Sequence, residues 1–231
     1  MVRRTKADAQ ATRCSLLDAA EQLFQARGVS RTSLNEIAVA AGTTRGAIYW
    51  HFKDKADLFN AMMERVSLPL EESLQCAVSM HAQCPVLELR VAMLEALRKT
   101  ATDAQTQRVF DIATHKVEYV AELLGVKERH LRVRNECLAR TTQAMQQVTE
   151  LRGRPLSVDV NTAALGLHVM IDGLIQNWLL DPEAFDLVAT GSQIFDTYLA
   201  GLGLQPVQVA DKKDSLALSK SALGAMDSIA K

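Results

Sequence analysis

The sequence is poor in cysteine, proline and aromatic residues: its 231 residues include four cysteines, five prolines, two tryptophans, three tyrosines and six phenylalanines. The cysteines show no paired C-x-x-C spacing, so neither a zinc site nor a disulfide framework is indicated. We expect free thiols in a reducing compartment, buried by default as small apolar side chains. A redox sensor, which requires a thiol of lowered pKa, is the alternative for one of Cys14, Cys76, Cys84 and Cys137.

Signals for export and for membrane insertion are also missing, because the N-terminus is polar and has no apolar core segment. The apolar stretch 163–180 is about as long as a membrane span, but His168, Asp172, Gln176 and Asn177 interrupt it. Such side chains are costly in lipid. We therefore expect a buried helix in a cytoplasmic protein that has no membrane partner.

Enzyme signatures are absent as well, since the sequence contains no phosphate-binding loop, nucleophile elbow or zinc-binding helix motif. Titratable residues are present, but no pair has a diagnostic spacing. We expect a protein that is not an enzyme and that needs no cofactor and no metal. The main alternative from another class is an enzyme in which residues 33–52 form only a structural corner.

Charge is distributed unevenly along the chain. Residues 1–60 contain nine Lys or Arg and six Asp or Glu, whereas the remaining residues contain 17 and 21, so formal charges of +3 and −4 combine to −1. A basic N-terminal segment is the electrostatic footprint of a protein that binds DNA, and an acidic remainder argues against nucleic-acid binding elsewhere. The excess is small, so specific contacts matter more than bulk attraction.

Residues 33–52 have the pattern of two short helices joined by a turn. Ser33 and Glu36 have the spacing of a capping box, which predicts a helix over 34–41. Gly42 can adopt the left-handed conformation that ends a helix, and Thr43 is predicted to cap a second helix over 44–51. Such a pair is a helix-turn-helix, whose second helix enters the DNA major groove.

The second of these helices carries side chains suited to DNA. Hydroxyl and imidazole groups can donate to phosphate oxygens, and Arg45 can contact a guanine edge through two hydrogen bonds. The alternative is a tight corner closed by an aromatic core. Because Tyr49, Trp50 and Phe52 cannot all contact DNA, we assign Phe52 and Ile48 to the core. The predicted DNA-binding residues, with a basic arm at the N-terminus, are Arg3, Arg4, Ser33, Thr43, Thr44, Arg45, Gly46, Tyr49, Trp50, His51 and Lys55.

Residues 10–60 resemble the N-terminal domain of the TetR family of transcriptional repressors. The family pattern is Thr-x-x-x-Ile-Ala-x-x-Ala-Gly-x-(Ser/Thr)-x-Gly-x-(Ile/Leu)-Tyr-x-His-Phe. Ser33 stands where threonine is usual, and the other positions match at Ile37, Ala38, Ala41, Gly42, Thr44, Gly46, Ile48, Tyr49, His51 and Phe52. Residues 2–6, 45–52 and 171–175 further resemble the AcrR and TtgR subgroup, whose members repress multidrug efflux-pump operons of the resistance-nodulation-division (RND) type and are released by drugs.

Beyond residue 60 the sequence predicts helices almost throughout, with breaks at prolines and glycines and no alternating run typical of a strand. The fold class is therefore all-α. The predicted helices are 8–27, 34–41, 44–51, 55–81, 86–101, 104–123, 127–152, 158–180 and 183–202, which match the nine-helix, two-domain plan of the family. We expect a DNA-binding domain over 1–55, a ligand-binding and dimerisation domain over 56–204, and a tail over 205–231 that is an extra helix or disordered.

Polar residues recur every four positions on the apolar helix predicted at 158–180, at His168, Asp172 and Gln176. Buried polar groups need partners, so this stripe is predicted to face a ligand cavity or a partner subunit; a stripe that faces solvent is the alternative. Gly166 and Gly173 on the same helix would let another helix approach closely, as in a dimer interface built with the last helix.

The resemblance implies an effector pocket among the helices of residues 86–180. Methionine and aromatic side chains give adaptable pocket walls, and a few polar groups orient the ligand. Each candidate is also a plausible core residue, His115 in particular. The predicted ligand-binding residues are Met93, Phe110, Thr114, His115, His168, Ile171, Asp172, Ile175 and Gln176.

The prediction for the whole chain is a homodimeric repressor that binds a palindromic double-stranded operator. Its recognition helices would lie about 34 to 36 Å apart, in successive major grooves. By resemblance, it controls an RND-type efflux operon and is released by a hydrophobic antimicrobial. The alternative is a TetR-type regulator that senses one dedicated metabolite and controls a non-efflux operon, as repressor or as activator.

Overall fold

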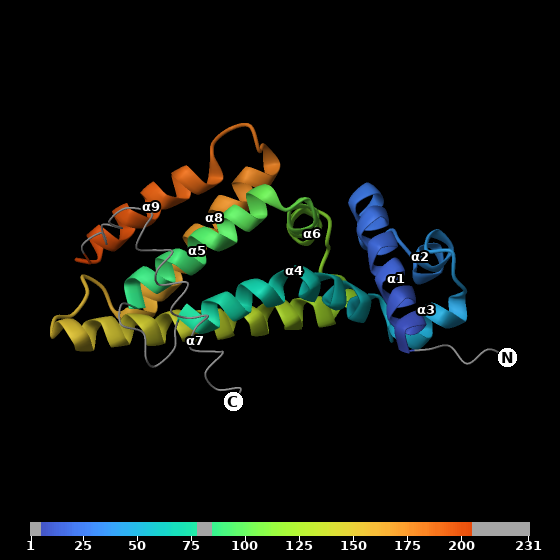
Figure 1. Cartoon of the computed structure of the whole chain (residues 1–231), viewed down its shortest axis with the longest axis horizontal. Coiled ribbons are helices and arrows are strands. Elements are labelled where there is room, and N and C mark those ends of the chain that lie inside the picture. Colours follow the sequence, from blue (N-terminus) through green and yellow to red (C-terminus); the bar gives the residue numbers. More distant parts are fainter. Residues whose placement is uncertain (1–5, 78–84, 205–231) are drawn as a thin grey trace, which may run out of the picture.

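The computed structural model describes residues 6–77 and 85–204, and within these ranges the chain forms nine α-helices, one short 3₁₀ helix and no strand (Figure 1). The all-α prediction is confirmed. Arg3, Arg4, Cys84 and the tail 205–231 lie outside the described residues. The helices are α1 Lys6–Arg27, α2 Leu34–Ala40, α3 Arg45–His51, α4 Lys55–Ala77, α5 Pro85–Thr102, α6 Ala104–His115, η1 Ala121–Leu123, α7 Leu124–Arg152, α8 Val160–Leu180 and α9 Leu187–Gly201.

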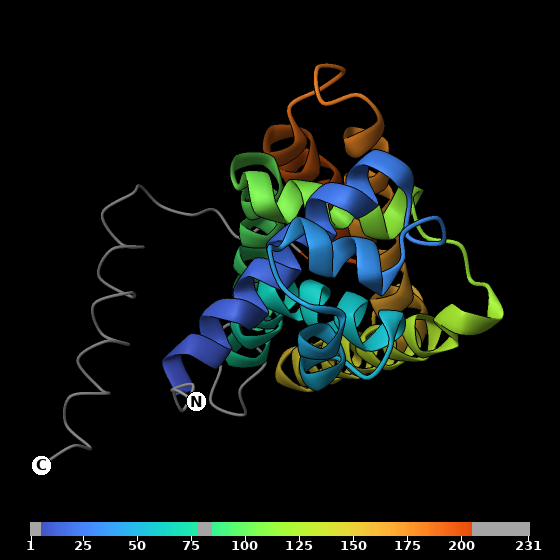
Figure 2. The ribbon, with the colours of Figure 1, turned by 90° about the vertical axis from the view of Figure 1, so that its right-hand side faces the viewer.

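The helices form two groups. Helices α1, α2 and α3 gather at one end of the molecule, and Figure 2 looks onto this end. Helix α4 leads away from them and runs beside α7, while α5, α8 and α9 form the rest of the second group (Figure 1). Helix α6 lies between the groups, in contact with α1 on one side and with α5 and α8 on the other.

Three predicted helix boundaries are wrong. Helix α6 ends at His115 and not at 123, and α7 begins at Leu124, so that Gly125 lies in its first turn. Gly125 does not break the helix, and a Cβ there would lie in ordinary contact with the Cβ of Ala56 on α4, at 3.4 Å. Helix α9 begins at Leu187 and not at 183, because the carboxylate of Asp186 accepts a hydrogen bond from the backbone N–H of Ala189 at 2.8 Å and caps the helix there.

Three clusters of buried apolar residues hold the fold together. The first joins α1–α3 and the start of α4 to α6, η1 and α7, through Val109, Ile112, Leu123 and Val126. The second joins α5, α7, α8 and α9, and the third, around Leu97 and Trp178, joins α5, α8 and the start of α9. The first cluster therefore extends across the predicted boundary at residue 55 into the second group of helices.

Polar contacts attach α9 to its neighbours. The guanidinium of Arg90 on α5 donates to both carboxylate oxygens of Asp196, at 2.7 and 2.9 Å, and to the Ser192 hydroxyl at 2.7 Å. The hydrogen bonds from Arg90 hold the pKa of Asp196 below its usual value. The Tyr198 hydroxyl donates to the Ala163 carbonyl at 3.0 Å and fills the space that a Cβ on Gly166 would occupy. The close approach predicted at Gly166 is thus made by α9 of the same chain.

Lys55 joins three segments at the base of the N-terminal group. Its ammonium donates to the carbonyls of Val29 and Ser30, both at 3.1 Å, and to a Glu122 carboxylate oxygen at 2.8 Å. The Lys55 side chain is only 11% exposed. The first residue of α4 therefore satisfies carbonyls just beyond the end of α1 and ties them to η1.

Replacing Lys55 by methionine keeps the apolar stem of the side chain but removes the ammonium. We expect Lys55→Met to lower the free energy of unfolding by about 1 to 3 kcal/mol, because the part-buried carbonyls of Val29 and Ser30 lose a donor. Urea unfolding at one fixed protein concentration, followed by circular dichroism, measures this change. Lys53→Met, at an exposed lysine, is the matched control and should shift it by less than about 0.5 kcal/mol. Equal unfolding midpoints for the two variants would contradict the role of Lys55.

Candidate DNA interface and effector site

Helix α2 begins with a complete capping box. The Ser33 hydroxyl accepts a hydrogen bond from the Glu36 backbone N–H at 3.3 Å, and the Ser33 backbone N–H donates to the Glu36 carboxylate at 2.8 Å. These bonds, the one from the Ser33 backbone foremost, lower the pKa of Glu36. The polar groups of Ser33 are therefore used to start α2, although the residue is exposed.

The turn between α2 and α3 closes on Gly42. This glycine has a φ of +65°, and the backbone N–H groups of Gly42 and Thr43 donate to the carbonyls of Val39 and Ala38 at 3.0 and 2.9 Å. The paired bonds are those of a Schellman motif. They engage the backbone of Thr43, so the cap of α3 is Thr44, whose hydroxyl accepts from Ala47 N–H at 3.2 Å. The predicted cap at Thr43 is wrong by one residue.

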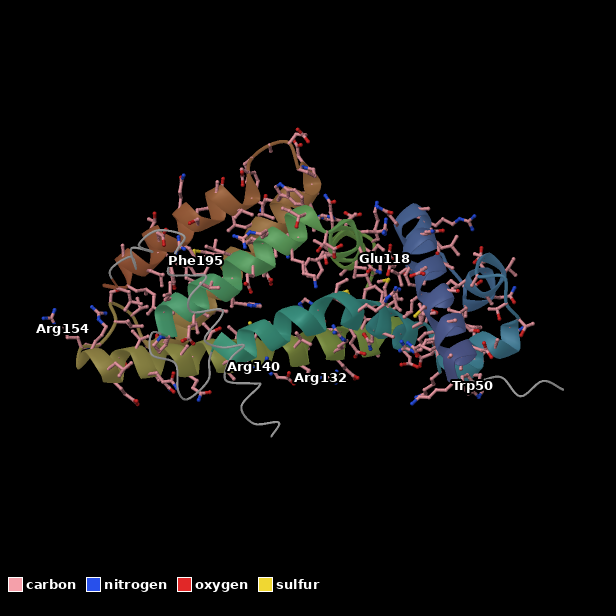
Figure 3. The ribbon with its side chains drawn as sticks, in the orientation of Figure 1. Trp50, Glu118, Arg132, Arg140, Arg154 and Phe195 are labelled. Atoms are coloured by element: carbon pink, nitrogen blue, oxygen red, sulfur yellow. The ribbon has the colours of Figure 1, made fainter. Side chains whose placement is uncertain are left out.

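Helix α3 has one buried face and one exposed face. Ile48 and Phe52 are almost fully buried in the first cluster, which confirms their assignment to the core. Tyr49 and Trp50 are 49% and 74% exposed, and Figure 3 shows Trp50 at the outer edge of the N-terminal group. Arg45 and Gly46 are also exposed. The residues that the core does not use are those predicted to bind DNA.

Two contacts with aromatic rings order this exposed face, one made by His51 and one by Arg45. The half-buried His51 ring meets the Trp50 ring edge-on, with 4.6 Å between centroids. The Arg45 guanidinium lies over the Tyr49 ring, 5.7 Å from its centroid, so a planar donor group is held at the surface. Lys55 is the exception among the predicted DNA contacts, because its ammonium is bound within the protein, whereas Lys53 is exposed.

Three of the predicted effector-binding residues come together in the third cluster. Phe110 from α6 and Ile171 and Ile175 from α8 pack, half-buried, against the cluster that contains Trp178. Met93, on α5, is buried in the second cluster, against which Ile171 also packs. Residues far apart in sequence thus form one apolar region between α5, α6 and α8.

The polar stripe of α8 divides between two environments. His168 and Asp172 are half-buried, with 3.3 Å between Nε2 and the carboxylate, whereas Gln176 is exposed. Gln176 shares its helix face with the exposed Leu165, Val169 and Leu180 and does not line the apolar region. In the described part of the chain, no three His, Cys, Asp or Glu side chains gather as a metal site would require.

The other two predicted effector residues lie towards the end of α6. Thr114 is half-buried, and the Nδ1 atom of His115 lies 2.9 Å from the Asp111 carboxylate, within the same helix. His115 lines a hollow of about 310 Å³ formed with residues 25–31 at the end of α1. The exposed His115 side chain thus lies at the end of α6 beside residues 25–31 and pairs with Asp111 of its own helix, and not with the polar stripe of α8.

Sequence reasoning missed a buried carboxylate at the junction of the two groups of helices. Glu21 on α1 is 3% exposed, and its partners are Arg65 on α4 and Gln105 and Arg108 on α6. A signal was present: Glu21 shares a helix face with Leu17 and Phe24, which are core residues. A charged residue within an apolar stripe requires a partner from elsewhere in the fold.

Comparison with protein families gives two matches. Residues 16–62 match the family of bacterial regulatory proteins of the tetR family, and residues 84–204 match the C-terminal region of MAATS-type transcriptional repressors. The first match covers α2, the Gly42 turn and α3, and the second covers α5–α9.

Individual relatives agree with the family matches. The regulator TtgR of Pseudomonas putida is 35% identical over 206 residues, which are 89% of this chain and 98% of TtgR. NalD, the secondary repressor of the MexAB-OprM multidrug efflux pump in Pseudomonas aeruginosa, superposes with a TM-score of 0.76 at 35% identity, over 85% of this chain and 98% of NalD. SmeT, the repressor of the Stenotrophomonas maltophilia multidrug efflux pump SmeDEF, has been solved in complex with triclosan. It superposes with a TM-score of 0.75 at 31% identity, over 87% of this chain and 100% of SmeT.

These matches extend along both groups of helices and confirm the predicted resemblance. Proteins of this kind are transcriptional regulators and not enzymes. A capped recognition helix with an exposed polar and aromatic face, a second group of helices with its own apolar clusters, and relatives aligned over nearly their whole length lead to the same assignment: the chain belongs to the TetR family of bacterial transcriptional regulators.

Proposed function

We propose that the protein is a homodimeric repressor that binds a palindromic operator, controls an RND-type multidrug efflux operon, and is released by a hydrophobic antimicrobial. The single observation that carries the proposal is the exposed face of α3, held outward by the Thr44 cap and by the burial of Ile48 and Phe52. The proposal that the regulated operon encodes an efflux pump comes from the relatives named above, since NalD and SmeT repress multidrug efflux pumps.

The α3 face has the donors that a major-groove reader needs. Arg45 can form paired hydrogen bonds to guanine, and the Trp50 ring can contact thymine methyl groups. The Tyr49 hydroxyl, Thr44 and His51 would donate to phosphates, which orient the helix without reading sequence. The exposed Lys53, and not Lys55, would be the lysine that contacts the phosphate backbone of the DNA. Arg3 and Arg4 remain predicted contacts of an N-terminal arm.

A second copy of the chain would cover the exposed face of α8. Helix α8 is apolar enough, by length and composition, to cross a membrane, yet only 28% of its most apolar window is buried within one chain. Leu165 and Val169 on this face are 49% and 57% exposed, and Ile194 on the neighbouring α9 is 37% exposed. Apolar side chains concentrated on two adjacent helices support a dimer interface. Gly173 lies on α8 as well, and a Cβ added there would meet no atom of the same chain within 4 Å.

The apolar region between α5, α6 and α8 is the proposed effector site. Phe110, Ile171 and Ile175 would form its walls, with Met93 at one side and the His168–Asp172 pair as the polar group. Few polar groups and adaptable apolar walls suit varied hydrophobic ligands. The SmeT complex with triclosan makes that compound the first probe.

Arg45→Ala should weaken binding to DNA from the region upstream of the gene by about 30-fold or more, because each of the two subunits loses a two-bond contact to a base worth about 1 to 3 kcal/mol. Fluorescence anisotropy with labelled DNA at two salt concentrations measures the affinity. Arg154→Ala is the matched control, because it removes the same charge from an exposed residue at the opposite end of the molecule (Figure 3). An equal loss for both variants would indicate bulk electrostatics and contradict a specific role for Arg45.

Phe110→Ala should weaken triclosan binding about tenfold or more, since burying an aromatic side chain contributes about 1.5 to 3 kcal/mol. The chain has two tryptophans, and Trp50→Phe leaves Trp178, in the third cluster, as the only indole. Its fluorescence then reports ligand binding directly. Tyr119→Ala, at a 50% exposed aromatic outside all three clusters, is the control. Unchanged affinity in Phe110→Ala would place the ligand elsewhere.

The double variant Leu165→Glu/Val169→Glu should convert the dimer to a monomer, because two carboxylates on each face would be buried without partners. Sedimentation equilibrium measures the mass. Leu124→Glu changes a similarly exposed leucine on α7 and should leave the dimer intact. The monomer should also lose operator affinity, since it engages one half-site only. A dimer that survives the double substitution would rule out this face.

A further inference from the structure

Glu21 lies at the point where α1, α4 and α6 meet. One oxygen of its carboxylate, Oε1, accepts hydrogen bonds from Gln105 Nε2 at 2.9 Å and from Arg65 Nη1 at 3.2 Å. The other, Oε2, lies 3.5 Å from Arg108 Nε. We refer to Glu21, Arg65, Gln105 and Arg108 as the junction cluster. It is a polar contact between the DNA-binding helices and both α4 and α6.

The two oxygens of Glu21 are not equally satisfied. Oε1 has two hydrogen bonds, whereas the contact of Oε2 with Arg108 is at a length where a hydrogen bond is weak. The Nε atom of Arg108 is buried and has no hydrogen-bond partner. An unpaired buried donor is costly, so a shift of α6 towards α1 by a fraction of an ångström would gain a charge-assisted hydrogen bond. The cluster is therefore sensitive to the position of α6.

The opposite side of α6 reaches the proposed effector site. Phe110, two residues after Arg108, packs against both the first and the third apolar clusters. Val109 and Ile112 of the same helix are fully buried in the first cluster. A ligand that displaces Phe110 would move a short, rigid helix, and Gln105 and Arg108 would move with it. The distances from Gln105 and Arg108 to the Glu21 carboxylate would then change together. Two discrete arrangements of these contacts are what coupling between distant sites requires.

We propose that Glu21 is a positioning residue for induction: it converts a displacement of α6 by the effector into a change in how α1, and with it α3, is held. This inference rests on the proposed function, because it presumes an effector that releases DNA. Without the carboxylate charge, the junction cluster no longer favours one position of α6 over another, and α6 is linked to the DNA-binding helices mainly by apolar contacts such as those of Val109 and Ile112. Effector binding and operator binding then lose part of their linkage while each site stays intact.

The decisive quantity is the coupling factor, the ratio of operator dissociation constants with and without saturating effector, which is typically 5- to 150-fold. Glu21→Gln keeps an acceptor for Gln105 but removes the charge that attracts Arg108. It should reduce the coupling factor at least threefold relative to the wild-type protein. Arg108→Gln should reduce the coupling factor to a similar extent. The double variant should have the same coupling factor as either single variant, because each substitution removes the same Glu21–Arg108 interaction.

Asp18→Asn is the matched control. Asp18 lies on α1, three residues before Glu21, and pairs with the same Arg65 at 2.8 Å, but its side chain is 56% exposed and its ion pair is with α4 and not with α6. It should leave the coupling factor unchanged. A purely structural role for Glu21 would instead lower the thermal unfolding midpoint and leave the coupling factor as it is.

The experiment is an anisotropy titration of the full-length dimer with operator DNA, with and without triclosan or the most active member of a panel of apolar antimicrobials. Wild-type release together with unchanged release in both Glu21→Gln and Arg108→Gln would overturn the inference and leave the proposed function standing. Absence of release in the wild-type protein with every compound would overturn the proposed function, and the inference with it. Should Glu21→Gln fold poorly, Arg108→Gln decides, because Arg108 is 37% exposed and its replacement buries no new group.

Discussion

Helix α6 has to satisfy two apolar clusters and one buried carboxylate at the same time, and this constraint organises the molecule. Val109 and Ile112 complete the core of the DNA-binding helices, Phe110 reaches the cluster around Trp178, and Gln105 and Arg108 meet Glu21. A helix of twelve residues that is buried on two sides cannot move without changing both neighbourhoods. The two groups of helices are therefore one mechanical unit.

The recognition surface follows from a different kind of constraint, which is local. The Schellman turn at Gly42 and the Thr44 cap set the direction in which α3 starts, and the burial of Ile48 and Phe52 sets its rotation about its own axis. With the start and the rotation of α3 set in this way, the side chains of Arg45, Tyr49 and Trp50 face solvent. The proposed DNA-binding face thus consists of the residues that capping and core packing do not use.

Helix α8 shows how one helix can serve an interior and an interface. Ala163 and Leu167 pack in the second cluster, Trp178 packs in the third, and Leu165 and Val169 remain exposed. Its two glycines differ for the same reason: Gly166 admits the Tyr198 hydroxyl, whereas a Cβ added at Gly173 would meet no atom of the same chain within 4 Å. The apolar composition that resembles a membrane span is explained by packing on one side and by the proposed partner subunit on the other.

Features that depend on neighbours a few residues away could be predicted from the amino-acid sequence alone. The capping box at Ser33, the left-handed Gly42, the burial of Ile48 and Phe52 and the all-helical class are of this kind, because caps and helical periodicity involve residues within about one or two turns. Features that depend on residues far apart in the chain became visible only in the folded molecule. Tertiary structure turned Lys55 inward to Glu122, left Gln176 exposed, ended α6 at His115, and brought Arg65 and Arg108 to Glu21. A charged side chain can face water or a buried partner at nearly the same local cost, so only the partner's position, set by the packing of other helices, decides between them.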